Sequence, residues 1–325
     1  MFKWFWLVVR NYQARCLSLS KAMCGLRQAQ PSTVLVVTVF LFLVGCGAAA
    51  TPIAPTATIT VAAATPTFTP LPTLTSTSTP AATPTPTAPA EPGDVVYMVP
   101  DVVGTRPHDA TAFTQGLILY NGFLYESTGL YGQSSLRQVN PETGEVIQSV
   151  PLAETYFAEG LERVEDRLIQ ITWREQTAFV YDIMTFALLN TFSYTGEGWG
   201  LCYDGNDLYM SNGSDYLTVR DPETFAVRSE IPVTLEGQPV VRLNELECVG
   251  STVFANIWQT DTIVQIDKSS GQVVAVIDAT GLLTAEERAT TDVLNGIVYQ
   301  PEANTFLITG KLWPMIFEVR FVIAG

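Results

Sequence analysis

Histidine is almost absent from this sequence, and cysteine is scarce outside its first 46 residues. The only histidine is His108, and of the five cysteines only Cys202 and Cys248 lie beyond that N-terminal segment. No CxxC pair or other metal-binding spacing occurs. Because zinc sites in proteins need several such ligands at characteristic spacings, a histidine-based zinc site is close to excluded. We expect no metal-ligating residues and chemistry that requires no cofactor.

Basic residues are also few once the N-terminus is set aside. Five of the 17 lysines and arginines lie in the first 46 residues, whereas no acidic residue precedes Glu91. The remainder of the chain therefore has 12 basic residues against 32 acidic ones. Such a surface repels nucleic acid, because phosphate binding needs lysine and arginine. It suits a soluble extracellular domain.

No hydrophobic run is long enough to span a bilayer comfortably. The longest apolar run near the N-terminus, residues 34–45, has twelve residues and follows positive charges, as in the core of a signal peptide. Leu43-Val-Gly-Cys46 resembles a bacterial lipobox, in which cleavage leaves a lipid-modified cysteine at the new N-terminus. We expect residues 1–46 to be a lipoprotein signal and Cys46 to be lipidated, so that the exported protein is anchored at the outer face of the cell membrane. An ordinary signal peptide or a short anchor is the alternative.

Residues 47–93 have the composition of a linker. They are almost wholly threonine, proline and alanine, with no large hydrophobic periodicity. Such a segment cannot bury enough apolar surface to fold, and its prolines keep it extended. We interpret it as a stalk, which leaves residues 94–325 as the folded domain.

The folded domain contains a fivefold repeat. Its units open at Phe113-Thr-Gln-Gly-Leu, Phe157-Ala-Glu-Gly-Leu, Gly198-Trp-Gly-Leu, Leu243-Asn-Glu-Leu and Leu294-Asn-Gly-Ile. Each unit has short apolar stretches separated by polar turns, and the period is 40–51 residues. Four short strands per unit at this period are typical of a β-propeller blade. We therefore predict an all-β, five-bladed β-propeller; a β-sandwich, the alternative, would not repeat at this interval.

The last unit holds only about three strands. The β-rich segment Val95–Val103 lies upstream of the first unit, and we expect it to complete the last blade. Helical periodicity is confined to residues 284–290.

Aligning the units places one residue of each at the start of the innermost strand. These residues are Gln115, Glu159, Trp199, Asn244 and Asn295. A second shared position follows near the end of the next strand, with Gly129, Trp173, Gly213, Trp258 and Lys311. Because a hairpin returns to the level at which it started, both sets should surround one mouth of the central channel.

The mixture at these ten positions indicates a small-molecule site. A lone tryptophan is more often a core residue, and a lone glutamate such as Glu159 is as often a solvated turn residue. A carboxylate, an ammonium group, carboxamides and three indoles at one mouth together favour a binding site with opposed polar groups and aromatic walls.

The same residues resemble a known family, the plant-type glutamine cyclotransferases. The resemblance covers residues 98–320 and is carried by motifs in every unit: His108-Asp109, 112–117, 125–132, 157–161, 198–201, 243–247, 255–258, 294–296 and 309–314. Departures are mild, such as Ile171 for leucine and Asn212 for aspartate. The resemblance implies a five-bladed propeller that converts N-terminal glutamine of peptides or proteins to 5-oxoproline and releases ammonia. It also implies that a structural cation could occupy the channel, with ligands that the sequence does not identify.

The resemblance also implies roles for the residues at the mouth. Glu159 would be the proton shuttle, with Lys311, Gln115 and Asn244 stabilising the oxyanion and orienting the amide. The expected substrate-binding residues are Trp199, Trp173, Trp258, Phe157, Phe113 and Asn295.

Two other functions compete with this one. A non-catalytic binding propeller would need the aromatic mouth but not a carboxylate facing an ammonium group. A lactonase would need several carboxylate metal ligands, and the ten mouth positions hold only one carboxylate.

We expect a monomer that acts on peptides, binds no nucleic acid and meets the membrane only through its anchor. Cys202 and Cys248 are expected to be buried, reduced thiols, since inner strands of neighbouring blades often lie too far apart for a disulfide.

Overall fold

A computed structural model of the protein describes residues 94–325. The predicted signal peptide, the lipobox cysteine Cys46 and the linker lie outside the described residues and stay predictions. The described residues are all-β apart from one short helix, α2 (Ala285–Arg288), which begins at the expected place with a capping box between Thr284 and Glu287. None of their helices is both long and apolar enough to cross a membrane.

Three of the sheets each contain four strands that follow one another along the chain. The first has β2 (Thr114–Tyr120), β3 (Phe123–Thr128), β4 (Ser135–Val139) and β5 (Val146–Pro151). The second has β6 (Ala158–Val164), β7 (Arg167–Thr172), β8 (Thr177–Asp182) and β9 (Leu188–Ser193). The third has β10 (Leu201–Tyr203), β11 (Leu208–Met210), β12 (Tyr216–Arg220) and β13 (Val227–Pro232), and a small hairpin of β14 (Thr234–Leu235) and β15 (Gln238–Pro239) follows it.

The remaining strands form one eight-stranded sheet. They are β16 (Leu243–Val249), β17 (Thr252–Ile257), β18 (Thr262–Asp267), β19 (Val273–Asp278), β20 (Leu294–Gln300), β21 (Thr305–Gly310), β22 (Met315–Ile323) and β1 (Val96–Pro107). Strand β1 pairs antiparallel with β22 from Met98–Ile323 to Pro107–Met315, as expected of the upstream segment. It also pairs in parallel with β19 over three residues, and this contact joins the two halves of the sheet.

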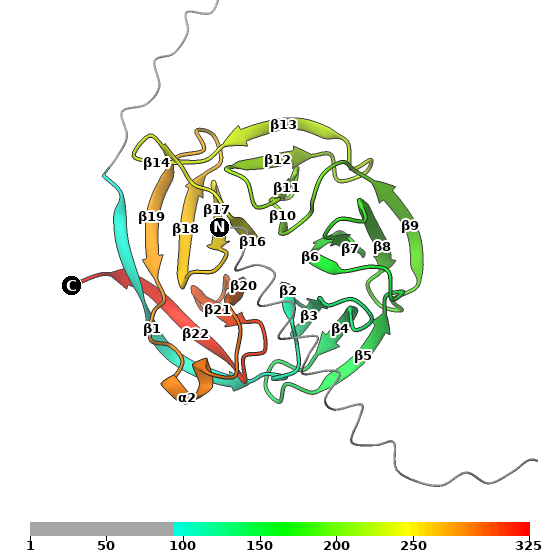
Figure 1. Cartoon of the computed structure of the whole chain (residues 1–325), viewed down its shortest axis with the longest axis horizontal. Coiled ribbons are helices and arrows are strands. Elements are labelled where there is room, and N and C mark those ends of the chain that lie inside the picture. The colour runs from blue at the N-terminus through cyan, green and yellow to red at the C-terminus, as the bar shows by residue number, and fades with distance from the viewer. Residues whose placement is uncertain (1–93) are drawn as a thin grey trace, which may run out of the picture. The chain divides into compact units, whose positions relative to one another are not determined.

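The sheets stand around a common centre (Figure 1). Strands β2, β6, β10, β16 and β20 lie nearest that centre, and each following strand lies farther out. The ends of the described chain meet at the outer edge, where β1 lies beside β22. This arrangement brings the first strand of every sequence repeat to the middle of the molecule.

Repeated turn chemistry explains why four units adopt the same hairpin between their third and fourth strands. Asn140, Asp182, Asp221 and Asp267 each accept hydrogen bonds from the backbone N–H groups two and three residues later. Such side-chain-to-backbone bonds favour turns over continued strands. The outer hairpin is therefore encoded locally in each repeat.

Apolar side chains between neighbouring sheets form the core. Val164, Ile169 and Ile171 of the second sheet pack against Leu201 and Leu208 of the third, and all five side chains are at most 1% exposed. Burying such side chains from water is the main favourable term in folding. The packing holds each innermost strand at a fixed distance from the next.

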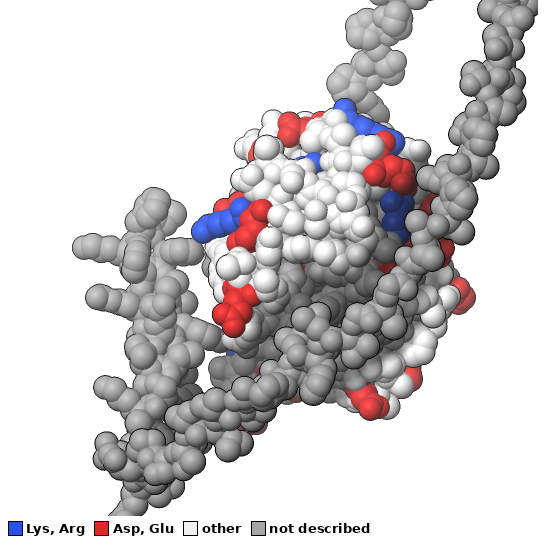
Figure 2. Space-filling model, turned by 90° about the vertical axis from the view of Figure 1, so that its right-hand side faces the viewer, with Lys and Arg blue, Asp and Glu red and all other residues white. Residues whose placement is uncertain are grey.

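One side of the molecule is shown in Figure 2. Acidic and basic side chains lie near one another at the edges of a broad uncharged area there, without an extended group of basic residues. Strand β9 lies on this side, with Leu188 and Leu189 each 54% exposed. This face therefore offers little for a phosphate backbone to bind.

The prediction of two reduced thiols is wrong. Cys202 of β10 and Cys248 of β16 form a disulfide, with Cα atoms 5.4 Å apart. The innermost strands approach one another more closely than the sequence prediction assumed. A Cβ atom on Gly200 would lie 2.1 Å from the Asn244 carbonyl oxygen, so only glycine permits this approach. Two residues later the strands are still close enough for a disulfide.

Reducing this disulfide is expected to lower the free energy of unfolding by about 2–4 kcal/mol, because it closes a loop across two sheets. Urea unfolding of oxidised and reduced protein measures the difference. A Cys202→Ser/Cys248→Ser variant is the control and should not respond to reductant. Peptide-resolved thiol labelling of denatured, unreduced protein should leave both cysteines unlabelled; labelling of both would contradict the disulfide.

Candidate active site

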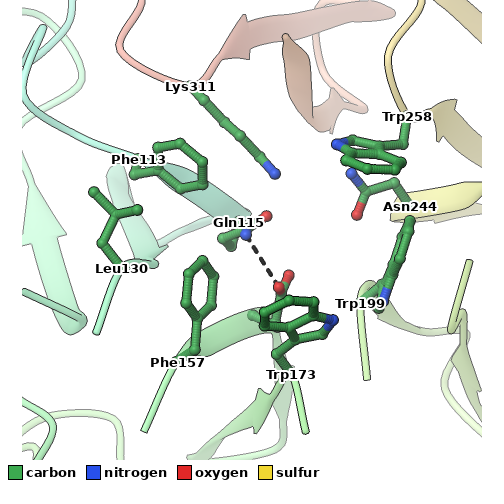
Figure 3. Close-up of a pocket in the computed structure, with 10 residues that line it drawn as sticks. Phe113, Gln115, Leu130, Phe157, Trp173, Trp199, Asn244, Trp258 and Lys311 are labelled. Atoms are coloured by element: carbon green, nitrogen blue, oxygen red, sulfur yellow. Dashed lines mark hydrogen bonds between the residues drawn. The ribbon is translucent and has the colours of Figure 1, made fainter. Parts of the chain in front are cut away.

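A cavity of about 200 Å³ opens at one end of the innermost strands. Nine of the ten predicted catalytic and substrate-binding residues line it, and Figure 3 shows them converging on one space from different strands. The lining residues are Phe113, Gln115, Leu130, Phe157, Glu159, Trp173, Trp199, Asn244, Trp258 and Lys311. The structure thus brings together side chains that lie up to 198 positions apart in the sequence.

Backbone hydrogen bonds explain why the two aligned sets meet at one mouth. The first aligned position opens the innermost strand of each unit, and the second lies near the end of the next strand. In four units, the residue at the second position donates its backbone N–H to the carbonyl oxygen of the residue two places before the first position. These bonds join Gly129 to Phe113, Trp173 to Phe157, Trp258 to Arg242 and Lys311 to Val293. The third unit differs, since Gly213 donates to Leu243 of the next unit. Equivalent positions in the sequence therefore become equivalent positions around the cavity.

The glycines in the second set leave room for aromatic side chains from neighbouring strands. A Cβ atom on Gly129 would lie 2.5 Å from the Phe157 ring, and one on Gly213 would lie 2.6 Å from the Trp199 ring. Each glycine thus allows an aromatic ring to pack directly against its backbone. The aromatic lining depends on these small residues as much as on the rings.

The polar residues of the cavity are deeply buried. Glu159 and Lys311 are each 5% exposed, and Gln115 and Asn244 are each 2% exposed. Gln115 donates from Nε2 to Glu159 Oε1 at 3.1 Å, and Asn295 Nδ2 lies 3.3 Å from Gln115 Oε1. Asn295 itself is fully buried and lies behind the lining rather than in it. Its position suits orienting Gln115 better than touching a ligand.

Burial changes the proton affinity of both charged groups. It raises the pKa of Glu159 well above its ordinary value; the Lys311 ammonium opposes this shift, and the carboxylates of Glu197 and Glu175 add to it. Burial lowers the pKa of Lys311, against the attraction of Glu159 and Asp292. No ion pair joins Glu159 to Lys311 within residues 94–325, and Lys311 Nζ instead lies 4.8 Å from the centre of the Phe113 ring. A carboxyl group with a raised pKa is suited to exchanging protons near neutral pH.

Three comparisons with known proteins agree on the family. The family model described as glutamine cyclotransferase matches residues 73–321. A glutaminyl-peptide cyclotransferase of Arabidopsis thaliana is 40% identical over 226 residues, which are 68% of this chain and 70% of that protein. The crystal structure of Myxococcus xanthus glutaminyl cyclase superimposes with a TM-score of 0.65 at 39% identity, covering 71% of this chain and all of that one. The chain belongs to the glutamine cyclotransferase family.

The structure adds two residues to the site that sequence reasoning missed in this glutamine cyclotransferase. Leu130 lines the cavity next to Gly129, and Glu197 lies at its edge, bonded to two of the tryptophans. A signal for Glu197 was present, because it stands two residues before Trp199, the position that Phe113 and Phe157 occupy in their units. Leu130 follows Gly129, and the residues at the same position of the fourth and fifth units, Gln259 and Leu312, share its positive backbone φ but do not line the cavity.

His108 lies outside the cavity. Its ring nitrogens lie 2.7 Å from the Trp313 carbonyl oxygen and 3.0 Å from Glu126 Oε1, and Glu126 also pairs with Arg137. This buried network joins the end of β1, β3 and β4 to the turn between β21 and β22, so the histidine has a structural role. No cluster of three or more histidine, cysteine or acidic side chains within residues 94–325 is arranged to hold a metal ion. A structural cation in the channel stays an expectation drawn from the family.

Proposed function

We propose that this protein is a glutaminyl-peptide cyclotransferase, which converts N-terminal glutamine of peptides or proteins to 5-oxoproline and releases ammonia. The observation that carries the proposal is the buried Glu159, which accepts a hydrogen bond from Gln115 and shares a small aromatic cavity with Lys311. The cavity suits a single terminal residue rather than a length of chain. The Arabidopsis thaliana relative is a glutaminyl-peptide cyclotransferase and the Myxococcus xanthus relative is a glutaminyl cyclase, and the chain matches them over about two thirds of its length.

The reaction is an intramolecular aminolysis. The neutral α-amine attacks the γ-carboxamide carbon, a C–N bond forms, and the bond to the carboxamide nitrogen breaks to release ammonia. Since nucleophile and electrophile belong to one residue, the enzyme mainly has to hold the side chain folded back toward the amine. The α-amine has a pKa near neutrality, so its neutral form is readily available.

The polar residues supply the proton transfers and the charge stabilisation. Glu159 accepts a proton from the attacking nitrogen and delivers it to the leaving nitrogen, and its raised pKa makes both transfers accessible. Lys311 and the carboxamide of Asn244 point into the same space and stabilise the oxyanion (Figure 3). Gln115 orients Glu159 and is itself held by Asn295.

The aromatic residues exclude water from the reacting atoms. Phe113 and Phe157 meet edge to face at 6.2 Å, Phe157 and Trp173 at 5.6 Å, and Trp199 and Trp258 at 5.3 Å between ring centres. A dry cavity strengthens the electrostatic interactions inside it. It also prevents hydrolysis, which would yield N-terminal glutamate instead of the cyclic product.

Chelators such as EDTA are expected to leave the chemical step intact. The proposed step uses a carboxylate, an ammonium group and carboxamides, while the single histidine and the two cysteines of the domain are already bonded elsewhere. The measurement is kcat before and after EDTA treatment and dialysis. Loss of activity that zinc restores fully would contradict the mechanism.

The function is tested by ammonia release from a peptide that begins with glutamine. An otherwise identical peptide that begins with asparagine is the matched control, because its shorter side chain would have to close a strained four-membered ring. An N-acetylated glutamine peptide, which lacks the nucleophilic amine, is the second. Release from the first peptide alone is the expected result. Binding of all three without release would favour a non-catalytic binding protein.

The proposed fold is a five-bladed β-propeller. Three four-stranded sheets correspond to three repeats, and the eight-stranded sheet divides at the short parallel contact between β1 and β19 into two further groups of four. One group is β16–β19, and the other is β20–β22 completed by β1. The ring in Figure 1 supports this division.

The proposed location is the outer face of the cell membrane. The apolar run followed by Leu43-Val-Gly-Cys46 supports export and lipidation at Cys46, and the acidic composition of the rest supports an extracellular domain. The disulfide between Cys202 and Cys248 agrees with an oxidising compartment. We propose that the protein acts there as a monomer.

A further inference from the structure

The aromatic lining of the cavity consists of two separate groups of rings. On one side the Phe157 ring contacts the rings of Phe113 and Trp173, with centres 6.2 and 5.6 Å apart. On the other side Trp199 contacts Trp258. Among the residues that the structure describes, no ring contact joins Trp173 to Trp199. Ring packing alone therefore does not fix the distance between the two groups.

One carboxylate bridges the gap between them. Glu197 Oε2 accepts hydrogen bonds from Trp173 Nε1 at 2.7 Å and from Trp199 Nε1 at 3.1 Å. Its Oε1 accepts from Arg174 Nε at 2.9 Å, and the Arg174 guanidinium lies 3.6 Å from the centre of the Trp173 ring. Hydrogen bonds to an ionised carboxylate are stronger and more directional than those between neutral groups. Both indoles are thus held by one atom.

The backbone around Glu197 is itself fixed to one of the indole residues. Gly198, the next residue, donates its N–H to the Trp173 carbonyl oxygen at 2.9 Å. A Cβ atom on Gly198 would lie 2.5 Å from the Tyr194 hydroxyl, so the segment passes through a narrow space. Glu197 also occupies the position that holds a phenylalanine in the first two repeats. In this repeat, that position therefore carries a hydrogen-bond acceptor for the indole N–H groups of Trp173 and Trp199 instead of an aromatic ring.

We propose that Glu197 is a positioning residue that sets the spacing and orientation of the Trp173 and Trp199 indoles, and thereby the width of the substrate cavity. The inference rests on the proposed cyclotransferase function, for which a glutamine side chain must be held folded back toward its own amine. A looser cavity would admit extended conformers and water. Glu197 touches no reacting atom and acts through the two indoles.

Glu197 also carries a charge near the site, and this effect must be separated from positioning. The groups that face Glu159 are the Lys311 ammonium and the carboxylates of Glu197 and Glu175, while Arg174 partly neutralises Glu197. The Glu197 charge raises the pKa of Glu159, so removing that charge should move the acid limb of kcat/KM to lower pH. Glu197→Gln removes the charge but keeps an oxygen that can accept both indole N–H groups.

Three substitutions at this position test the proposal in the full chain. Glu197→Ala removes both the acceptor and its volume, and Glu197→Met keeps the volume without the acceptor. Both are expected to lower kcat/KM by about 10–100-fold, since small misplacements near a reacting group have effects of this order. Glu197→Gln should stay within about threefold of wild type at its own optimum, with the acid limb moved to lower pH. Glu223→Ala, which removes the partner of a surface Arg167 pair, is the matched control and should change nothing.

The outcomes separate this inference from the proposed function. A wild-type protein that releases no ammonia would overturn the function, whereas an active wild type with near-normal Ala and Met variants would overturn only the positioning role. Gln activity as low as that of Ala would also overturn it, because charge and not the bridge would then matter. Thermal unfolding checks that each variant is folded, and a variant that unfolds is replaced in the comparison by the other.

A double-mutant cycle gives a second reading. Trp199→Phe keeps an aromatic ring but removes one of the two bridged N–H groups. If Glu197 acts through the indoles, the fold-loss of kcat/KM caused by Glu197→Met should be at least threefold smaller in the Trp199→Phe background than in wild type. The reason is that the effects of coupled residues are not additive. Equal losses in both backgrounds would contradict the bridge.

Discussion

Replacing Glu159 with glutamine is expected to lower kcat by about 10²–10⁴-fold and to change KM little, because a positioned proton shuttle contributes a factor of this size. Glutamine has nearly the same volume and can still pair with Gln115, but it cannot accept a proton. The loss would therefore report chemistry rather than binding. Steady-state kinetics with a glutamine-initiated peptide, over a range of pH, measures both constants.

Stability provides the control for this variant. Since burial raises the pKa of Glu159, the folded protein binds its proton more tightly than the unfolded chain does. The stabilisation that this tighter proton binding gives the folded protein is complete below the pKa of Glu159 in the unfolded chain. It is lost as the pH rises through the pKa of Glu159 in the folded protein. At alkaline pH Glu159→Gln should thus be at least as stable as wild type in urea unfolding.

A raised KM with an unchanged kcat for Glu159→Gln would contradict the shuttle role. That result would identify Glu159 as a group that only binds the substrate ammonium.

Replacing Lys311 with methionine is expected to lower kcat by about 10²–10³-fold, the usual effect of removing one oxyanion donor. Methionine retains most of the length and the contact with Phe113 but has no charge. The Lys311 ammonium also holds the pKa of Glu159 down, so its loss should raise that pKa further. Because the shuttle begins as a carboxylate, the acid limb of kcat/KM should move to higher pH.

The direction of that shift makes the Lys311 experiment specific. Lys311→Met and Glu197→Gln remove charges of opposite sign near Glu159 and should move the acid limb in opposite directions. Measuring kcat/KM from acid to neutral pH for both variants and wild type gives the comparison. Shifts in the same direction, or an unchanged kcat for Lys311→Met, would contradict the assignment of Lys311 to the oxyanion.

The sequence was informative about the site because the site is built from equivalent positions of a repeat. Gln115, Glu159 and Asn244 open the innermost strands of their units, and the hairpins return Trp173 and Lys311 to the same level. Position in the repeat therefore predicted position in space without knowledge of any long-range contact. The all-β class followed from the same pattern and is confirmed.

Features that depend on distances between units could not be predicted in this way. The disulfide requires the close approach that Gly200 permits, and a repeat pattern contains no measure of how near adjacent strands lie. The Glu197 bridge depends on side-chain directions in the third unit, where the backbone bonding departs from that of the others. Strand β1 extends to Pro107, beyond the expected segment, because its partner β22 is long enough to pair with it throughout.

The most direct test of the proposed chemistry follows the two nitrogens of the substrate glutamine. A peptide whose N-terminal glutamine carries ¹⁵N only in the side-chain amide is incubated with the purified protein, and product and ammonia are analysed by mass spectrometry. Attack by the α-amine predicts labelled ammonia and an unlabelled cyclic product lighter than the substrate by one ammonia. Unchanged peptide, or a product with the mass of N-terminal glutamate, would contradict the account.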